Sequence, residues 1–201
     1  MSTHRLVDVR TPSSPACAVI VLHGGASRQQ QMMVSPTQLS VLRMIPVAKR
    51  IAHAGHGRLA VLRLLNSYRG WDTRHTPVDD AAWAIAQVGE RWPGVPVALV
   101  GHSLGGRAAL LGAAHDAVRT VVALNAWVYP QDGVALPGRS VLFVHGDQDR
   151  IARPERARAV ADRLGRSADV EFRVVPGGKH AMLRHGRAFE QAAADFVVDR
   201  L

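Results

Sequence analysis

Short apolar runs and longer amphipathic segments alternate along this chain. A run that is apolar at nearly every position is typical of a strand buried on both faces, whereas apolar residues recurring every three or four positions indicate a helix. The apolar runs predict strands over residues 5–9, 16–22, 59–65, 95–100, 118–124, 140–144 and 170–175. The amphipathic segments predict helices over residues 39–54, 77–92, 104–115, 154–164 and 187–201.

Two of these helices carry local signals. Pro46 lies inside the first one and predicts a kink or a break there. Thr76 can cap the second, in which Pro77 fits the first turn and Asp79 and Asp80 favour the positive end of the helix dipole.

Strands that alternate with helices are typical of a parallel sheet with helices on both faces. We therefore expect an α/β fold, a three-layer α/β/α sandwich around a mostly parallel, doubly wound sheet. The chain has 201 residues and no internal repeat, which suits one domain with a large core and is too short for two. The expected organisation is a single domain over residues 1–201.

The formal net charge of +9 raises the question of a nucleic-acid partner. The positive side chains are nearly all arginines scattered along the chain, and aromatic residues, at 5%, are too few for a base-stacking surface. A solvated, arginine-rich surface explains the charge better, so we expect no nucleic-acid binding. The densest group of arginines can still favour acidic substrates or surfaces; it comprises Arg150, Arg153, Arg156, Arg158, Arg163 and Arg166.

The N-terminal residues lack the apolar stretch of a secretory signal, and the apolar runs are far shorter than the roughly 20 residues of a membrane span. We therefore expect a cytoplasmic protein without a membrane span. The single cysteine, Cys17, lies in an apolar run, which favours a buried, unreactive thiol over a disulfide framework.

The segment Gly101-His102-Ser103-Leu104-Gly105-Gly106 lies between a predicted strand and a predicted helix. A chain that turns from strand to helix within a few residues needs small residues on both sides of the turn, and Gly101 and Gly105 meet that need. The turn exposes the residue between them at the N-terminus of a helix. The hydroxyl of Ser103 is therefore the candidate nucleophile.

A nucleophilic serine needs a base to take its proton and an acid to orient that base. Candidates for both roles lie in loops that follow predicted strands, and the carboxyl ends of parallel strands meet at one edge of a sheet. His180 is the candidate base, because it lies in a glycine-rich loop after the last strand, and Asp149 is the candidate acid, with Asp147 as the alternative. The other histidines near strand ends are weaker candidates for the base: His23, His102, His145 and His185.

Hydrolysis by a serine also needs N–H groups aimed at the developing oxyanion. The turn at Ser103 positions the backbone N–H of Leu104 for this role. The second donor is expected from the loop after Leu22, where Gly24-Gly25 allows the main chain to approach a substrate. Gly25 is favoured, and Ala26 is the alternative.

The order Ser103, Asp149, His180, with His23-Gly24-Gly25 upstream, resembles the α/β-hydrolase fold family. The segment Tyr68-Arg69-Gly70-Trp71 is similar to an Arg-Gly turn that many members carry before the nucleophile. The resemblance covers residues 16–201 and implies a serine hydrolase that needs no metal and no organic cofactor.

The connection over residues 124–140 has no room for the lid that larger members of the family insert, so we expect an open site without a cap domain. Its walls would come from the loop over residues 27–38, with Met32 and Met33, and from Trp127 and Tyr129. Met32, Trp127 and Tyr129 are the candidate substrate-binding residues.

Together these features predict a serine hydrolase that cleaves small-molecule carboxylic esters or thioesters through an acyl-enzyme on Ser103. The alternative is a catalytically silent relative that binds a small molecule or a partner protein. The three candidate catalytic groups argue against that alternative, because a binding module does not need all of them.

Overall fold

The structure is a computed structural model that describes residues 4–25 and 32–200. Its centre is a seven-stranded sheet with the strand order β1-β3-β2-β4-β5-β6-β7. The strands are β1 (Arg5–Arg10), β2 (Cys17–Leu22), β3 (Leu59–Leu65), β4 (Val97–His102), β5 (Val118–Leu124), β6 (Ser140–Gly146) and β7 (Asp169–Val175). All neighbours pair in parallel except β1, which runs antiparallel to β3 at one edge, and this confirms the predicted mostly parallel sheet.

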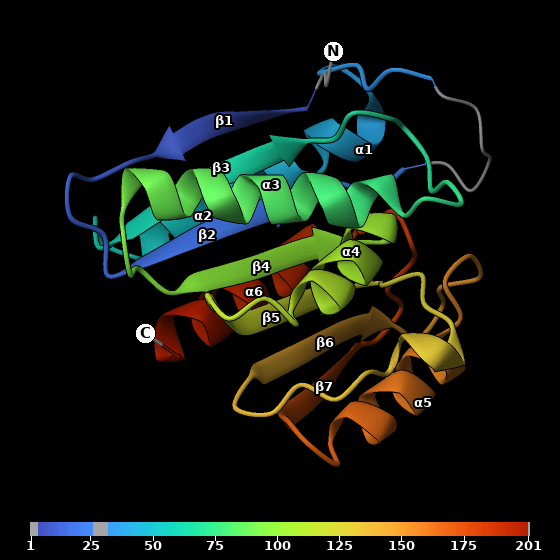
Figure 1. Cartoon of the computed structure of the whole chain (residues 1–201). Coiled ribbons are helices and arrows are strands. Elements are labelled where there is room, and N and C mark those ends of the chain that lie inside the picture. The colour runs from blue at the N-terminus through green and yellow to red at the C-terminus, as the bar shows by residue number, and fades with distance from the viewer. Residues whose placement is uncertain (1–3, 26–31, 201) are drawn as a thin grey trace.

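Helices cover both faces of this sheet (Figure 1). One face packs against α3 (Thr76–Arg91), α4 (Leu104–Gly112) and α5 (Pro154–Leu164), and the other packs against α2 (Met44–Ala54) and α6 (Gly186–Asp199). A short helix, α1 (Leu39–Leu42), precedes α2, and a 3-10 helix, η1 (Pro130–Asp132), follows β5. The three layers expected from the hydrophobic pattern are therefore present.

The central strand β2 is apolar throughout because both of its faces are buried. Ile20 and Leu22 belong to the core beneath α3 and α4, whereas Val19 and Val21 belong to the core beneath α2 and α6. Each such fully buried side chain contributes about 1.5–3 kcal/mol of transfer free energy. Burial also raises the pKa of the Cys17 thiol on this strand to about 12, so the thiol stays protonated near neutral pH.

The structure corrects two local predictions. The helix expected over residues 39–54 is two helices, and the break lies at Arg43 rather than at Pro46. Pro46 sits in the first turn of α2, where its missing N–H costs no hydrogen bond. Thr76 does not cap α3 but begins it; the carboxylate of Asp72 accepts hydrogen bonds from the backbone N–H and the hydroxyl of Thr76.

The ends of two helices also differ from expectation. The helix after Ser103 ends at Gly112, before the predicted residue 115, because the chain turns through residues 113–117 into β5. The C-terminal helix begins at Gly186, one residue early, and ends at Asp199.

The carboxyl ends of β2 to β7 point to the same side of the sheet, at the right of Figure 1. The loops that follow these strands therefore meet along one edge. Among the described residues, no helix is both long enough and apolar enough to cross a bilayer.

Candidate active site

Ser103 occupies a sharp turn between β4 and α4. Its backbone has φ 56° and ψ −118°, a conformation with positive φ that residues other than glycine adopt rarely. Two hydrogen bonds stabilise this conformation: the Ser103 N–H donates to the Leu124 carbonyl at 3.0 Å, and the Ser103 carbonyl accepts from the Trp127 N–H at 3.1 Å. A strained residue at a sharp turn from a strand into a helix is the backbone geometry of a nucleophile elbow.

Gly101 and Gly105, on the two sides of Ser103, lie so close to neighbouring backbone that neither position has room for a side chain. A Cβ on Gly101 would lie 2.1 Å from the carbonyl oxygen of Gly105. A Cβ on Gly105 would lie 2.5 Å from the carbonyl oxygen of His23, the residue after β2. The elbow can therefore form only with glycine at both positions.

The structure brings Ser103, His180 and Asp149 together. Nε2 of His180 lies 3.0 Å from Oγ of Ser103, and Nδ1 of His180 lies 2.8 Å from Oδ2 of Asp149. His180 belongs to the loop between β7 and α6, and Asp149 to the loop between β6 and α5. An ionised carboxylate only accepts hydrogen bonds, so Nδ1 carries the proton and Nε2 can accept from the serine hydroxyl.

The surroundings of Asp149 keep it ionised. Its carboxylate is buried, and Oδ1 accepts hydrogen bonds from the backbone N–H groups of Ile151 at 2.8 Å and Ala152 at 2.9 Å. Burial opposes ionisation, but hydrogen bonds from His145, His180 and Ile151 outweigh it and hold the pKa of Asp149 well below its usual range. A negative charge is thus available beside His180 over the whole neutral range.

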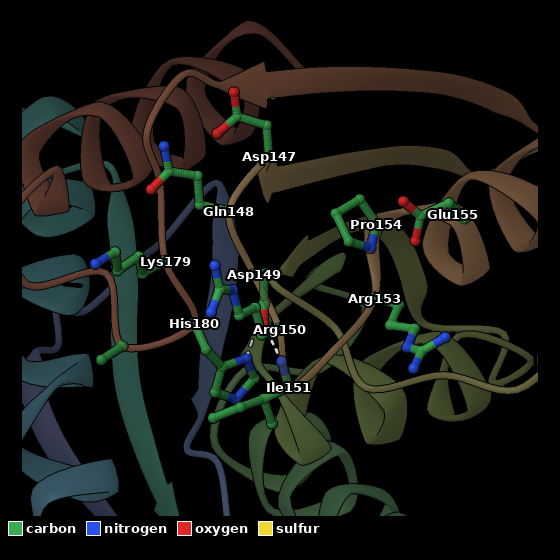
Figure 2. A pocket seen from close by; sticks show the side chains of 11 residues that line it. Asp147, Gln148, Asp149, Arg150, Ile151, Arg153, Pro154, Glu155, Lys179 and His180 are labelled. Carbon is green, nitrogen blue, oxygen red and sulfur yellow. Dashed lines mark hydrogen bonds and ion pairs between the residues drawn. The ribbon is translucent and has the colours of Figure 1, made fainter.

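Asp147, the alternative acid, makes a different contact. Its Oδ1 accepts a hydrogen bond from the backbone N–H of Gly177 at 2.7 Å, which ties the loop after β6 to the loop after β7. In Figure 2 its carboxylate points away from His180. Of the two carboxylates, Asp149 contacts the imidazole.

Three of the other histidines near the strand ends, His23, His102 and His145, form hydrogen bonds with backbone groups. His102 is buried, donates from Nε2 to the His180 carbonyl at 2.8 Å, and stays neutral because burial and the nearby His180 lower its pKa to about 3. His23 donates from Nδ1 to the Gly24 carbonyl at 2.6 Å, and its Nε2 accepts from the Asn66 N–H at 3.2 Å. These side chains shape the edge of the site.

The loop after β2 lies against the elbow. A Cβ on Gly25 would lie 2.0 Å from the carbonyl oxygen of Arg69 and 3.2 Å from Cδ1 of Leu104, so only glycine fits at this position. Gly25 therefore lies against the side chain of Leu104, the residue that provides the other expected oxyanion donor. Ala26, the alternative to Gly25, lies outside the described residues.

A cavity of about 960 Å³ opens beside His180. Its walls come from the loops after β6 and β7 and from the start of α5 (Figure 2). The side chains that line it, apart from Asp149 and His180, are mostly polar: Asp147, Gln148, Arg150, Ile151, Arg153, Pro154, Glu155, Lys179 and Ala181. Sequence reasoning missed this cavity, although the arginine-rich segment that begins at Arg150 borders it.

The three candidate substrate-binding residues do not line this cavity. Met32 is 47% exposed, and its sulfur accepts a hydrogen bond from Arg69 at 3.5 Å. Trp127 and Tyr129 follow β5 and pack edge to face, with ring centroids 5.0 Å apart. Their role in substrate binding remains a prediction.

One buried polar residue at this edge was not predicted. Asn125 directly follows β5 and contacts the loop that carries His180 and the end of β6, from which the loop of Asp149 continues. Its position after a predicted strand was the available signal. Within residues 4–25 and 32–200, no three His, Cys, Asp or Glu side chains are arranged to hold a metal ion.

Residues 13–141, more than half of the chain and including the elbow, match the family described as serine aminopeptidase, S33. The chain belongs to this family of α/β-hydrolases. No curated protein sequence matches it.

Solved structures agree with this α/β-hydrolase fold. Est1E from Butyrivibrio proteoclasticus superimposes with a TM-score of 0.72 at 17% identity, over 98% of this chain and 93% of that one. An α/β serine hydrolase without a lid from Xanthomonas campestris has a TM-score of 0.72 at 18% identity, over 98% and 88% of the two chains. Monoacylglycerol lipase from Paleococcus ferrophilus has a TM-score of 0.69 at 16% identity, over 98% and 99%.

Proposed function

We propose that this α/β-hydrolase cleaves carboxylic esters or thioesters of small molecules through an acyl-enzyme on Ser103. The observation that carries the proposal is the hydrogen-bonded series from Ser103 Oγ through His180 to Asp149, with distances of 3.0 and 2.8 Å. A serine hydroxyl is a weak nucleophile by itself, and an oriented imidazole is what activates it.

The first step transfers a proton. Nε2 of His180 removes the proton from Ser103 Oγ while the oxygen attacks the acyl carbon of the substrate. The imidazolium that forms is stabilised by the ionised Asp149, whose other oxygen is held by two backbone N–H groups. Asp149 itself keeps its charge throughout.

The second requirement is a partner for the oxyanion of the tetrahedral intermediate. The N–H of Leu104 and the N–H of Gly25 are the proposed donors. The oxyanion then reforms the carbonyl, the bond to the alcohol or thiol breaks, and His180 returns its proton to the leaving group. Water then attacks the acyl carbon while His180 takes its proton, and His180 returns that proton to Ser103 Oγ as the acid is released.

The substrate would be small, because the cavity beside His180 measures about 960 Å³ and is open to solvent. Relatives of similar fold support a carboxylic acid derivative: one structure of Est1E contains bound ferulic acid, with a TM-score of 0.73 at 15% identity, over 98% of this chain and 95% of that one. Another relative is a monoacylglycerol lipase.

The test combines a fluorophosphonate probe with short p-nitrophenyl esters and thioesters. Wild-type protein should bind the probe covalently at Ser103 and hydrolyse the esters, and Ser103→Ala should lose both, with turnover falling by about 10⁵-fold or more. Thermal unfolding of Ser103→Ala should match the wild type, because the substitution removes one oxygen.

Equal labelling of wild type and Ser103→Ala would reject Ser103 as the nucleophile. Absence of labelling and of hydrolysis in wild-type protein, together with saturable binding of ester analogues, would favour the catalytically silent alternative.

A further inference from the structure

The backbone carbonyl of His180 is held by two buried side chains from neighbouring strands. Nε2 of His102, the last residue of β4, donates to it at 2.8 Å. Nδ2 of Asn125, the residue after β5, donates to it at 3.2 Å and to the Lys179 carbonyl at 3.1 Å. Residues at the ends of β4 and β5 thus hold the backbone of the candidate base in place.

The other end of the Asn125 amide binds the end of β6, just before the loop that carries Asp149. Oδ1 accepts a hydrogen bond from the N–H of Gly146, the last residue of β6, at 2.8 Å. The Gly146 carbonyl in turn accepts from the Asp149 N–H at 3.2 Å. One side chain therefore connects the loop that carries Asp149 to the loop that carries His180.

We propose that Asn125 is a positioning residue for the reaction: its amide fixes the loops of Asp149 and His180 relative to each other and so keeps His180 in line between Asp149 and Ser103. The proposal rests on the hydrolase function proposed above. Asn125 touches no reacting atom, so its effect would act entirely through His180 and Asp149.

Only an amide fits the three contacts. The two carbonyls of Lys179 and His180 need a donor, and the N–H of Gly146 needs an acceptor. A carboxylate of the same shape would place an oxygen against two carbonyl oxygens, and a hydrophobic side chain would leave all three buried groups without this partner. Asn125 is fully buried, so such unmet groups would be costly.

The backbone of Asn125 also restricts what can replace it. Its φ is 44°, a left-handed conformation in which asparagine, aspartate and glycine are tolerated better than other residues. Asn125→Asp and Asn125→Gly therefore remove the donor without adding strong backbone strain. Asn125→Asp keeps the shape and the acceptor for Gly146, and Asn125→Gly removes the whole amide without adding a charge.

Direct backbone bonds also connect the two loops, including Gln148 N–H to the Gly178 carbonyl at 3.0 Å. Because these bonds remain in the variants, the loops should stay close, with His180 less well aligned. We expect kcat for p-nitrophenyl acetate to fall by about 10- to 100-fold in both variants, with KM nearly unchanged, because small misplacements of a catalytic group have effects of this size. The rate of fluorophosphonate inactivation should fall in parallel.

Ser167→Ala is the matched control. Ser167 Oγ likewise connects two segments, through bonds with the Leu136 N–H at 3.0 Å and the Leu164 carbonyl at 3.3 Å, but it lies away from the loops of His180 and Asp149. This variant should lower the melting temperature and leave kcat unchanged. A purely structural role of Asn125 would give the same pattern and would overturn the proposal, as would failure of both Asn125 variants to fold.

A measurement that does not need turnover separates this proposal from the hydrolase function. The proton between His180 Nδ1 and Asp149 should give a downfield resonance in the proton NMR spectrum, assigned by its absence in His180→Ala. We expect the resonance to shift or broaden in both Asn125 variants and to persist in Ser167→Ala. An unchanged resonance in the Asn125 variants would reject the positioning role whether or not the wild type hydrolyses esters.

Discussion

Asp147 and Asp149 lie two positions apart in one loop, yet their carboxylates have different surroundings. Asp149 is buried and binds His180, Ile151 and Ala152, whereas Asp147 is exposed and binds the N–H of Gly177. Asp149 therefore holds the imidazole of His180 in one tautomer, whereas Asp147 fixes the backbone of the loop after β7. A difference of this kind can be tested with single-atom changes.

We expect Asp149→Asn to lower kcat for ester hydrolysis by about 10³- to 10⁴-fold, because the amide can no longer stabilise the imidazolium and favours the wrong tautomer of His180. Asp147→Asn keeps an oxygen for Gly177 and should have a far smaller effect. Steady-state kinetics of the two variants on one p-nitrophenyl ester make the comparison. A larger loss in Asp147→Asn would contradict the assignment of Asp149.

At the scale of elements, the strand-turn-helix unit of β4, Ser103 and α4 depends on close backbone contacts. Gly101 faces the backbone of Gly105 across the turn, and Gly105 faces the end of β2. Elsewhere a glycine serves no such purpose: Gly89 lies on the exposed side of α3, and a Cβ there would meet nothing within 4 Å.

We therefore expect opposite effects from the same substitution at these two glycines. Gly101→Ala should lower the free energy of unfolding by at least about 3 kcal/mol, because the new Cβ overlaps backbone that cannot move without opening the elbow. Gly89→Ala should raise it by about 0.5–1 kcal/mol through helix propensity. Urea denaturation measures both, and a mild effect of Gly101→Ala would show that the elbow can rearrange.

The connection between α4 and η1 is a buried ion pair. Arg107 binds Asp132 through Nε at 2.7 Å and Nη2 at 2.9 Å, and its guanidinium lies 4.1 Å from the ring centre of Trp71 and 4.8 Å from that of Tyr129. The pair holds the segment of Trp127 and Tyr129 against the helix that begins at the elbow.

Removing one member of the Arg107–Asp132 pair should lower the free energy of unfolding more than replacing both. Asp132→Leu leaves the Arg107 charge buried without its partner and should cost about 3–5 kcal/mol of unfolding free energy, whereas the double variant Arg107→Met with Asp132→Leu should recover much of that loss. Chemical denaturation of the single and double variants measures the difference. Additive losses would mean that the two side chains do not stabilise each other.

At the scale of the whole molecule, acid stability depends on histidines that the fold buries. Burial lowers the pKa of His102 to about 3 from an ordinary value of 6.5, and burial lowers the pKa of His23 in the same direction. Below about pH 6.5 the unfolded chain binds protons that the native protein does not, so acidification favours unfolding. This contribution is absent above pH 6.5 and grows as the pH falls toward 3.

We expect the His102 contribution alone to lower the free energy of unfolding by about 2 kcal/mol between pH 7 and pH 5. His102→Gln keeps a donor for the His180 carbonyl but does not titrate, so the variant should show a smaller loss over this interval. Denaturation at the two pH values in both proteins is the measurement. Equal losses would show that His102 is protonated, or already exposed, in the native state.

The positions and types of strands and helices follow from the sequence because periodicity and turn residues act over short distances. The apolar run of β2, the amphipathic helices and the glycines around Ser103 each signal their structure within about ten residues. This is why the mostly parallel sheet, the elbow and the edge that carries the site could be predicted. The loops after successive parallel strands also had to meet at one edge.

The remaining features depend on residues that are far apart in the chain. Asp149 rather than Asp147 contacts His180 because the path of the loop after β6 is set by β7 and the loop beyond it. The contacts of Asn125 and the cavity beside His180 are likewise features that no local pattern encodes. The sequence by itself determined the elements and the candidate nucleophile, and tertiary packing decided which polar groups meet there, because only packing brings together buried donors and acceptors.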